Sequence, residues 1–68
     1  MEIKVNNQIK EFPSGELTVQ ALLDLEIPNK QNGLALAINN TVIPKTDWST
    51  HYIHDRDDIL IIIATQGG

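Results

Sequence analysis

Cysteine is absent from this chain of 68 residues, so disulfide bonds and thiolate metal ligands are excluded. A domain of this size buries a smaller fraction of its surface than a larger one does, and packing alone must stabilise it. We interpret residues 1–68 as one domain from a reducing compartment, and we expect a cytoplasmic location. The missing thiol also removes the commonest side chain on which proteins carry sulfur or an acyl group.

Basic residues and long apolar runs are scarce as well. Five Lys and Arg against nine Asp and Glu give a formal net charge of −4, and the basic residues are scattered. Nucleic-acid binders need clustered Lys and Arg, so we expect no nucleic-acid partner and favour a protein partner with a basic rim. No apolar run reaches the length of a membrane span, and no signal segment precedes the first strand pattern, so we expect no membrane association.

Residues suited to catalysis are also lacking. The chain has two Ser, no Gly-x-Ser-x-Gly sequence and no glycine-rich phosphate loop. His51 and His54 have the spacing of two metal ligands on a helix, but no Cys completes a zinc site, so we interpret them as solvated loop residues. We predict no enzyme activity, no catalytic residue, no bound metal and no bound cofactor.

Acidic residues gather just ahead of the last apolar run, where Asp55, Asp57 and Asp58 surround Arg56. Three carboxylates can bind a hard cation, but the glycine and the distal Glu of a calcium loop are missing. We predict instead a charged turn in which Asp side chains accept hydrogen bonds from nearby backbone. The same charges discourage edge-to-edge association of the aliphatic strand that follows.

Two strand patterns open the chain. Met1, Ile3 and Val5 alternate with polar residues, as in a half-buried strand. The pair Asn6-Asn7 suits a tight hairpin turn with positive φ angles, so residues 8–12 are predicted to form the returning strand.

A short helix is predicted next. Thr18 is a suitable N-cap, because its hydroxyl can accept a hydrogen bond from an amide of the first turn. Val19, Leu22 and Leu23 then form one apolar stripe, and Pro28 ends the helix.

A second hairpin is predicted from residues 34–38 and 41–43, with Asn39-Asn40 at its turn. Pro44 lacks a backbone donor, which confines the second of these strands to a sheet edge. Residues 45–58 read as irregular and contain the only Trp, Trp48. That ring is either a binding hot spot or, as we favour, an anchor for this loop in the core.

The last apolar run, residues 59–64, indicates a central strand buried on both faces. The order β-β-α-β-β-β then predicts an α+β fold, the β-grasp (ubiquitin-like) roll, with a mixed five-stranded sheet and one main helix. The first and last strands are expected to lie parallel, joined through the helix.

One short helix covers only one face of such a sheet. Alternate residues of the last strand are therefore expected on opposite faces: Ile59, Ile61 and Ile63 under the helix, and Leu60, Ile62 and Ala64 on the outer face. An exposed aliphatic patch on a small domain is a liability unless a partner covers it, so we predict partner docking on the outer face. Two alternatives remain: a one-residue slip that inverts the faces, and a second small core under residues 45–58.

The sequence ends in Gly67-Gly68. One interpretation is a frayed end of small residues. The other is that the terminal carboxylate is the reactive group, carried on a flexible tail, residues 65–68, that threads a narrow channel because glycine has no Cβ.

The chain resembles the ThiS family of sulfur carrier proteins in thiamine (thiazole) biosynthesis. The resemblance is carried by residues 36–44 (Leu-Ala-Ile-Asn-Asn-Thr-Val-Ile-Pro), Trp48, residues 55–59 (Asp-Arg-Asp-Asp-Ile) and residues 64–68 (Ala-Thr-Gln-Gly-Gly), and it covers essentially the whole chain. There are two departures. Arg56 stands where the family usually has Gly, so a turn that needs a positive φ would be either strained there or shaped differently. Gln66 stands where a small or apolar residue is common, which would alter the fit of the tail in a partner channel.

The resemblance implies a mechanism and partners. An ATP-dependent adenylating enzyme of the ThiF type would activate the carboxylate of Gly68, and a persulfide sulfur donor would convert it to a thiocarboxylate. A thiazole synthase of the ThiG type would accept the sulfur. Gly67 and Gln66 would thread the partner's active site, and Leu60, Ile62 and Ala64 would dock, with Ala35 and Ala37 as further candidates.

Three alternatives stay open. The small subunit of molybdopterin synthase is also a β-grasp sulfur carrier with a Gly-Gly end, although it is usually longer. A ubiquitin-like modifier would use the same carboxylate to form isopeptide bonds. A binding module would leave the tail idle.

Overall fold

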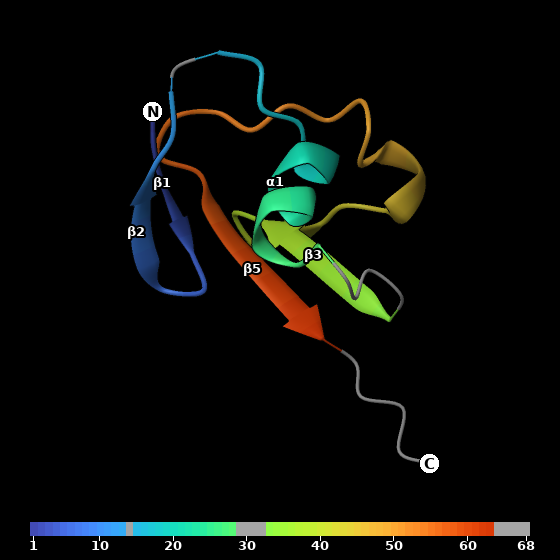
Figure 1. Ribbon diagram of the computed structural model, residues 1–68. Helices are drawn as coiled ribbons and strands as arrows, with labels where there is room; N and C mark the ends of the chain where they lie inside the picture. Colours follow the sequence, from blue (N-terminus) through green and yellow to red (C-terminus); the bar gives the residue numbers. More distant parts are fainter. Residues whose placement is uncertain (14, 29–32, 64–68) are drawn as a thin grey trace.

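The computed structural model describes residues 1–13, 15–28 and 33–63 of the chain. Within them, the strands and helices are β1 (Glu2–Val5), β2 (Gln8–Glu11), α1 (Val19–Glu26), β3 (Leu34–Ile38), β4 (Thr41–Val42), the 3₁₀ helix η1 (Lys45–Asp47) and β5 (Asp58–Ile63). The five strands form one sheet in the order β2-β1-β5-β3-β4, and α1 lies across one face of it (Figure 1). Strand β5 is central and runs parallel to β1 and antiparallel to β3. This architecture confirms the predicted β-grasp roll.

Two asparagine pairs make the hairpin turns. Asn6 and Asn7 have φ angles of 50° and 69°, and Asn39 and Asn40 have nearly the same values, 50° and 71°. Two successive positive φ angles are characteristic of the type I′ turn, whose twist matches that of the flanking strands, and Asn tolerates this conformation better than most residues. The predicted turn at Asn6-Asn7 is therefore confirmed, and it fixes the pairing of β1 with β2.

The helix α1 begins and ends as its sequence predicts. The Thr18 hydroxyl oxygen accepts a hydrogen bond of 3.1 Å from the Ala21 amide, as an N-cap does. The apolar stripe, Val19, Leu22 and Leu23, is fully buried against the sheet. No helix in the described part of the chain is long and apolar enough to cross a membrane.

The segment between β4 and β5 packs beside α1. Trp48 and Ile53 from this segment are buried in the main core, and the Trp48 indole Nε1–H donates a hydrogen bond of 2.9 Å to the Ile43 carbonyl. The carbonyls of His51 and Trp48 accept hydrogen bonds from the first two helical amides, those of Val19 and Gln20. Trp48 is thus the core anchor that we favoured rather than an exposed hot spot. Among the described residues, the buried side chains form one core that includes Trp48 and Ile53, so the second core considered for this segment is not found.

Strand β5 alternates between the two faces, with one exception. Ile59 and Ile61 are buried under α1, whereas Leu60 and Ile62 are about half exposed on the outer face. The predicted register is therefore correct, and the inverted alternative is wrong. Burial of this strand on both faces, also predicted, is not found, because α1 covers only one face of the described sheet. Ile63 was expected under the helix, but 51% of it is exposed, because the end of β5 extends past the end of α1 (Figure 1).

Candidate functional site

The residues predicted to carry and deliver sulfur, Gln66, Gly67 and Gly68, lie outside the described residues, as does the docking candidate Ala64. Their roles stay predictions. The described part of the candidate site is the strand that leads to them, β5, together with the outer sheet face around it.

The outer face is apolar beside the second half of β5. The pairing of β5 with β3 sets Leu60 opposite Ala37 and Ile62 opposite Ala35, so all four side chains lie on one face. Leu60 is 48% exposed and Ile62 is 50% exposed. Of the two alanines beside them, Ala35 is exposed and Ala37 is half-buried, and their small side chains allow close approach. Leu60 and Ile62 thus lie exposed on the outer face, as predicted, and their role in docking stays a prediction.

Strand pairing adds further apolar residues that the sequence analysis did not assign to this face. Val42 in β4 lies opposite Ala37, and Ile9 in β2 lies opposite Lys4, whose own neighbour in β5 is Asp58. Val42 and Ile9 are among the most exposed large apolar residues. Sequence periodicity could not assign either residue to the outer face. Strand β4 has only two residues, and β2 has four residues with little burial, so neither shows a clear alternation of buried and exposed positions.

Within the described residues, the charged side chains that strand pairing places on the outer face lie at one end of it. Glu2 lies opposite Glu11, and Lys4 lies beside Asp58, the first residue of β5. The face is therefore polar where β5 begins and apolar where β5 ends. We name the apolar part, formed by Leu60, Ile62, Ala35, Ala37 and Val42, the outer apolar patch.

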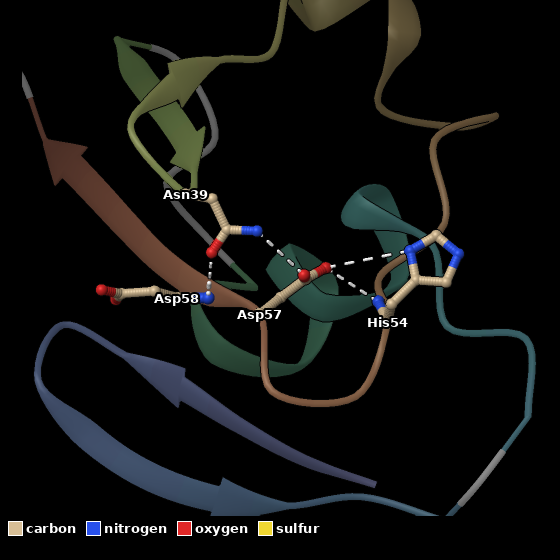
Figure 2. Close-up of polar contacts among 4 residues, drawn as sticks. All are labelled: Asn39, His54, Asp57 and Asp58. Carbon is tan, nitrogen blue, oxygen red and sulfur yellow. Dashed lines mark hydrogen bonds and ion pairs between the residues drawn. The ribbon is translucent and has the colours of Figure 1, made fainter.

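A polar network holds the start of β5 (Figure 2). The Asn39 side chain accepts a hydrogen bond of 3.0 Å from the Asp58 amide and donates one of 3.1 Å to Asp57 Oδ1. The other carboxylate oxygen of Asp57 accepts from the His54 amide at 2.8 Å. The predicted charged turn, with an Asp side chain bonded to nearby backbone, is confirmed.

The same turn contains a strained residue. Arg56 has a φ of 70°, and its amide donates to the Glu2 carbonyl while the Asp57 amide donates to the His54 carbonyl. Its side chain is 87% exposed, so no packing requires an arginine here. The strain expected where the related family usually has glycine is therefore present. In the described part of the chain, no group of three or more His, Asp and Glu side chains is placed to hold a metal ion.

The end of β5 is held by a contact that the sequence analysis missed. Asn6, the residue after β1, binds Ile61 through its side chain: Oδ1 accepts from the Ile61 amide at 2.7 Å, and Nδ2 donates to the Ile61 carbonyl at 3.3 Å. The sequence indicated a turn residue here. A contact between residues 55 positions apart depends on tertiary placement that local patterns do not contain.

Comparisons with known proteins, by family model and by sequence, point to the same family over nearly all of the chain. The family model for the ThiS family matches residues 3–68. Among curated proteins, the sulfur carrier protein ThiS of Escherichia coli strain K12 is 37% identical over 68 residues, which cover all of both chains.

Solved structures show the same fold. The crystal structure of the thiamine biosynthesis protein ThiS from Geobacter metallireducens has a TM-score of 0.84 at 20% identity, with both chains covered in full. The solution structure of a thiamine biosynthesis protein from the same organism has a TM-score of 0.79, also at 20% identity, and the match covers all of this chain and 88% of that one.

Proposed function

The chain belongs to the ThiS family, and from this membership we propose that it is a sulfur carrier of thiamine biosynthesis whose Gly68 carboxylate holds the sulfur. The observation that carries the proposal is the extent of the family match, which runs to residue 68 and so includes both terminal glycines. The 37% identity to the Escherichia coli sulfur carrier, over the full length of both chains, supports the same function.

The chemistry begins with activation, because a carboxylate is a poor electrophile. A ThiF-type partner transfers AMP from ATP to the Gly68 carboxylate, and pyrophosphate leaves. The terminal sulfur of a persulfide then attacks the carbonyl carbon, AMP leaves, and an acyl disulfide forms. A second thiol then attacks the donor's sulfur and forms a disulfide with it, which cleaves the acyl disulfide and releases the thiocarboxylate. Its sulfur then forms a bond to the substrate of a ThiG-type thiazole synthase, and an oxygen from that substrate or from water replaces it on the Gly68 carbonyl carbon, which returns the carboxylate.

The carrier in this proposal supplies a handle and a docking surface, and its partners supply catalysis. Fully extended, the last four residues span about 13 Å, which lets a docked carrier place its carboxylate inside a partner's active site. Gly67 and Gly68 suit a narrow channel, since they have no side chains to obstruct it. Gln66 enters the same channel.

The outer apolar patch is the proposed docking surface. Leu60 and Ile62 are exposed, lie next to each other on one face and belong to the strand that leads to the tail. Exposed contiguous apolar surface on a small domain is characteristic of a protein interface. Ala64 extends this surface in the proposal.

Mass spectrometry tests the proposed function. The protein is incubated with its ThiF-type enzyme, ATP, a persulfide donor and a thiol, and the expected product has one oxygen replaced by sulfur at Gly68. Omission of ATP is the control and should leave the mass unchanged. An unmodified mass in the complete reaction would contradict the proposal. Covalent conjugates to lysines of other proteins would instead indicate a ubiquitin-like modifier, and sulfur transfer to a molybdopterin precursor would indicate the related small subunit.

A further inference from the structure

The pairing of β1 with β5 continues beyond the end of β1, through a side chain. The last residue of β1, Val5, lies opposite Ile59, and the next backbone bond runs from the Asn6 amide to the Ile59 carbonyl at 2.9 Å. At Asn6 the backbone turns away with a φ of 50°, into the hairpin. The carboxamide of Asn6 then binds both the amide and the carbonyl of Ile61. The Asn6 side chain thus replaces the backbone hydrogen bonds to Ile61 that a longer β1 would make.

We propose that Asn6 is a positioning residue, which fixes the direction in which β5 delivers the C-terminal segment to the adenylating partner. The inference rests on the proposed sulfur-carrier function. Asn6 would act through Ile61, to which its side chain is bonded, and not on the reacting carboxylate.

The geometry explains why a carboxamide is needed. The backbone groups of Ile61 that point toward β1 are one donor, its amide, and one acceptor, its carbonyl, and a primary amide offers an acceptor and a donor in a single plane. Aspartate keeps the acceptor for the Ile61 amide but has no donor for the Ile61 carbonyl. Glycine suits the positive φ but makes neither bond.

The position of Ile61 links this contact to the tail. Ile61 lies two residues before Ile63, the end of β5, and its side chain is buried under α1. On the other side of β5, pairing with β3 continues through Ile62 opposite Ala35 and Ile63 opposite Leu34. Among the described residues, Asn6 thus makes the last hydrogen bonds that β5 receives on its β1 side. Without it, the end of β5 would be fixed along one edge only and could rotate about β3.

The chain offers two matched controls. Asn7 has the same residue type and a similar φ of 69°, but in the described part of the chain its side chain makes no hydrogen bond with β5. Asn39 occupies the first position of the second hairpin turn and also binds β5 through its side chain, but at Asp58, the opposite end of the strand. Loss of Asn39 therefore loosens β5 without freeing its delivery end.

The test measures adenylation kinetics with the carrier as the varied substrate, by pyrophosphate release, for the wild type, N6G, N6D, N7G and N39G. Misplacement of a reacting group lowers the rate of reaction more than the affinity, so we expect kcat of N6G to fall about tenfold while KM stays within about twofold. N6D should fall between N6G and the wild type. N7G and N39G should keep the wild-type kcat, and equal kcat values for N6G and N39G would overturn the inference.

A second measurement separates positioning from general destabilisation and does not need the partner. Nitrogen relaxation should show lower backbone order at Ile62 and Ile63 in N6G than in N39G, and the Ile61 amide should exchange faster in N6G alone. Unchanged order and exchange in N6G would overturn the inference. If the wild-type protein is not adenylated at all, the proposed function fails, and this measurement alone then decides whether Asn6 holds the end of β5.

Discussion

The indole Nε1–H of Trp48 donates a hydrogen bond of 2.9 Å to the carbonyl oxygen of Ile43, and both residues are buried. This bond joins the segment after β4 to the end of the second hairpin. It is the polar contact through which the largest core side chain is fixed in orientation. A bulky ring with one satisfied polar atom makes the segment between β4 and β5 part of the core rather than a separate loop.

Trp48→Phe should destabilise the fold by about 1–3 kcal/mol, because it leaves the buried Ile43 carbonyl without its donor and removes ring volume from the core. Urea unfolding followed by circular dichroism gives the free energy of unfolding. Tyr52→Phe, in the same segment at an exposed position, serves as the control and should have little effect. Equal stability of Trp48→Phe and the wild type would contradict the role assigned to this bond.

Arg56→Gly should stabilise the protein by about 1 kcal/mol, because glycine adopts a φ of 70° without the strain that a side chain brings. Arg56→Ala is the matched control: it also removes the exposed guanidinium but keeps a Cβ, so it should give no such gain. Thermal unfolding of the three proteins, side by side, measures the difference. A gain in both variants would assign the effect to charge rather than to backbone conformation.

Leu60→Asp should weaken docking to the adenylating enzyme, with KM for the carrier raised about tenfold or more, since a charge placed in an apolar contact must be desolvated. The fold should remain stable, because Leu60 faces outward. Leu25→Asp is the control, since Leu25 is a leucine exposed on α1, on the other side of the sheet. If both variants raise KM equally, the outer apolar patch is not the docking surface.

Removal of Gly68, or addition of one alanine after it, should abolish sulfur loading while the domain remains folded. Either change displaces the carboxylate by about 3.5 Å along an extended chain, which exceeds the tolerance of a reaction that needs atoms in near contact. Mass spectrometry of the loading reaction measures the product. Loading of either variant at the wild-type rate would mean that the carboxylate is not the acceptor.

Local patterns in the sequence predicted most of the fold. The alternation of apolar and polar residues predicted β1, and the apolar stripe of Val19, Leu22 and Leu23 predicted α1. The run of isoleucines predicted that β5 is the central strand of the sheet. These features succeed because period and composition act over a few neighbouring residues. The first asparagine pair was also correctly predicted as a hairpin turn with positive φ, since few other residues tolerate that backbone conformation.

Contacts between residues far apart in the sequence could not be predicted from such local patterns. Burial of Ile63 was predicted from its parity in the strand, but the extent of cover depends on how far α1 reaches along β5. The contact between Asn6 and Ile61 joins the two ends of the chain, and a turn residue gives no local sign of a second role. Ile9 and Val42 joined the outer face only once strand pairing was known.

The alternation of buried and exposed side chains along β5 determines which substitutions this strand should tolerate. Ile59 and Ile61 contribute to the stability of the fold, whereas Leu60 and Ile62, interleaved with them, are free to serve a partner. If Leu60 and Ile62 dock a partner as proposed, stability and recognition depend on adjacent residues with almost no overlap. A saturation library of this strand, sorted once for abundance and once for growth without thiamine, should divide into two interleaved sets, and recognition could be redesigned at the even positions while the fold is kept.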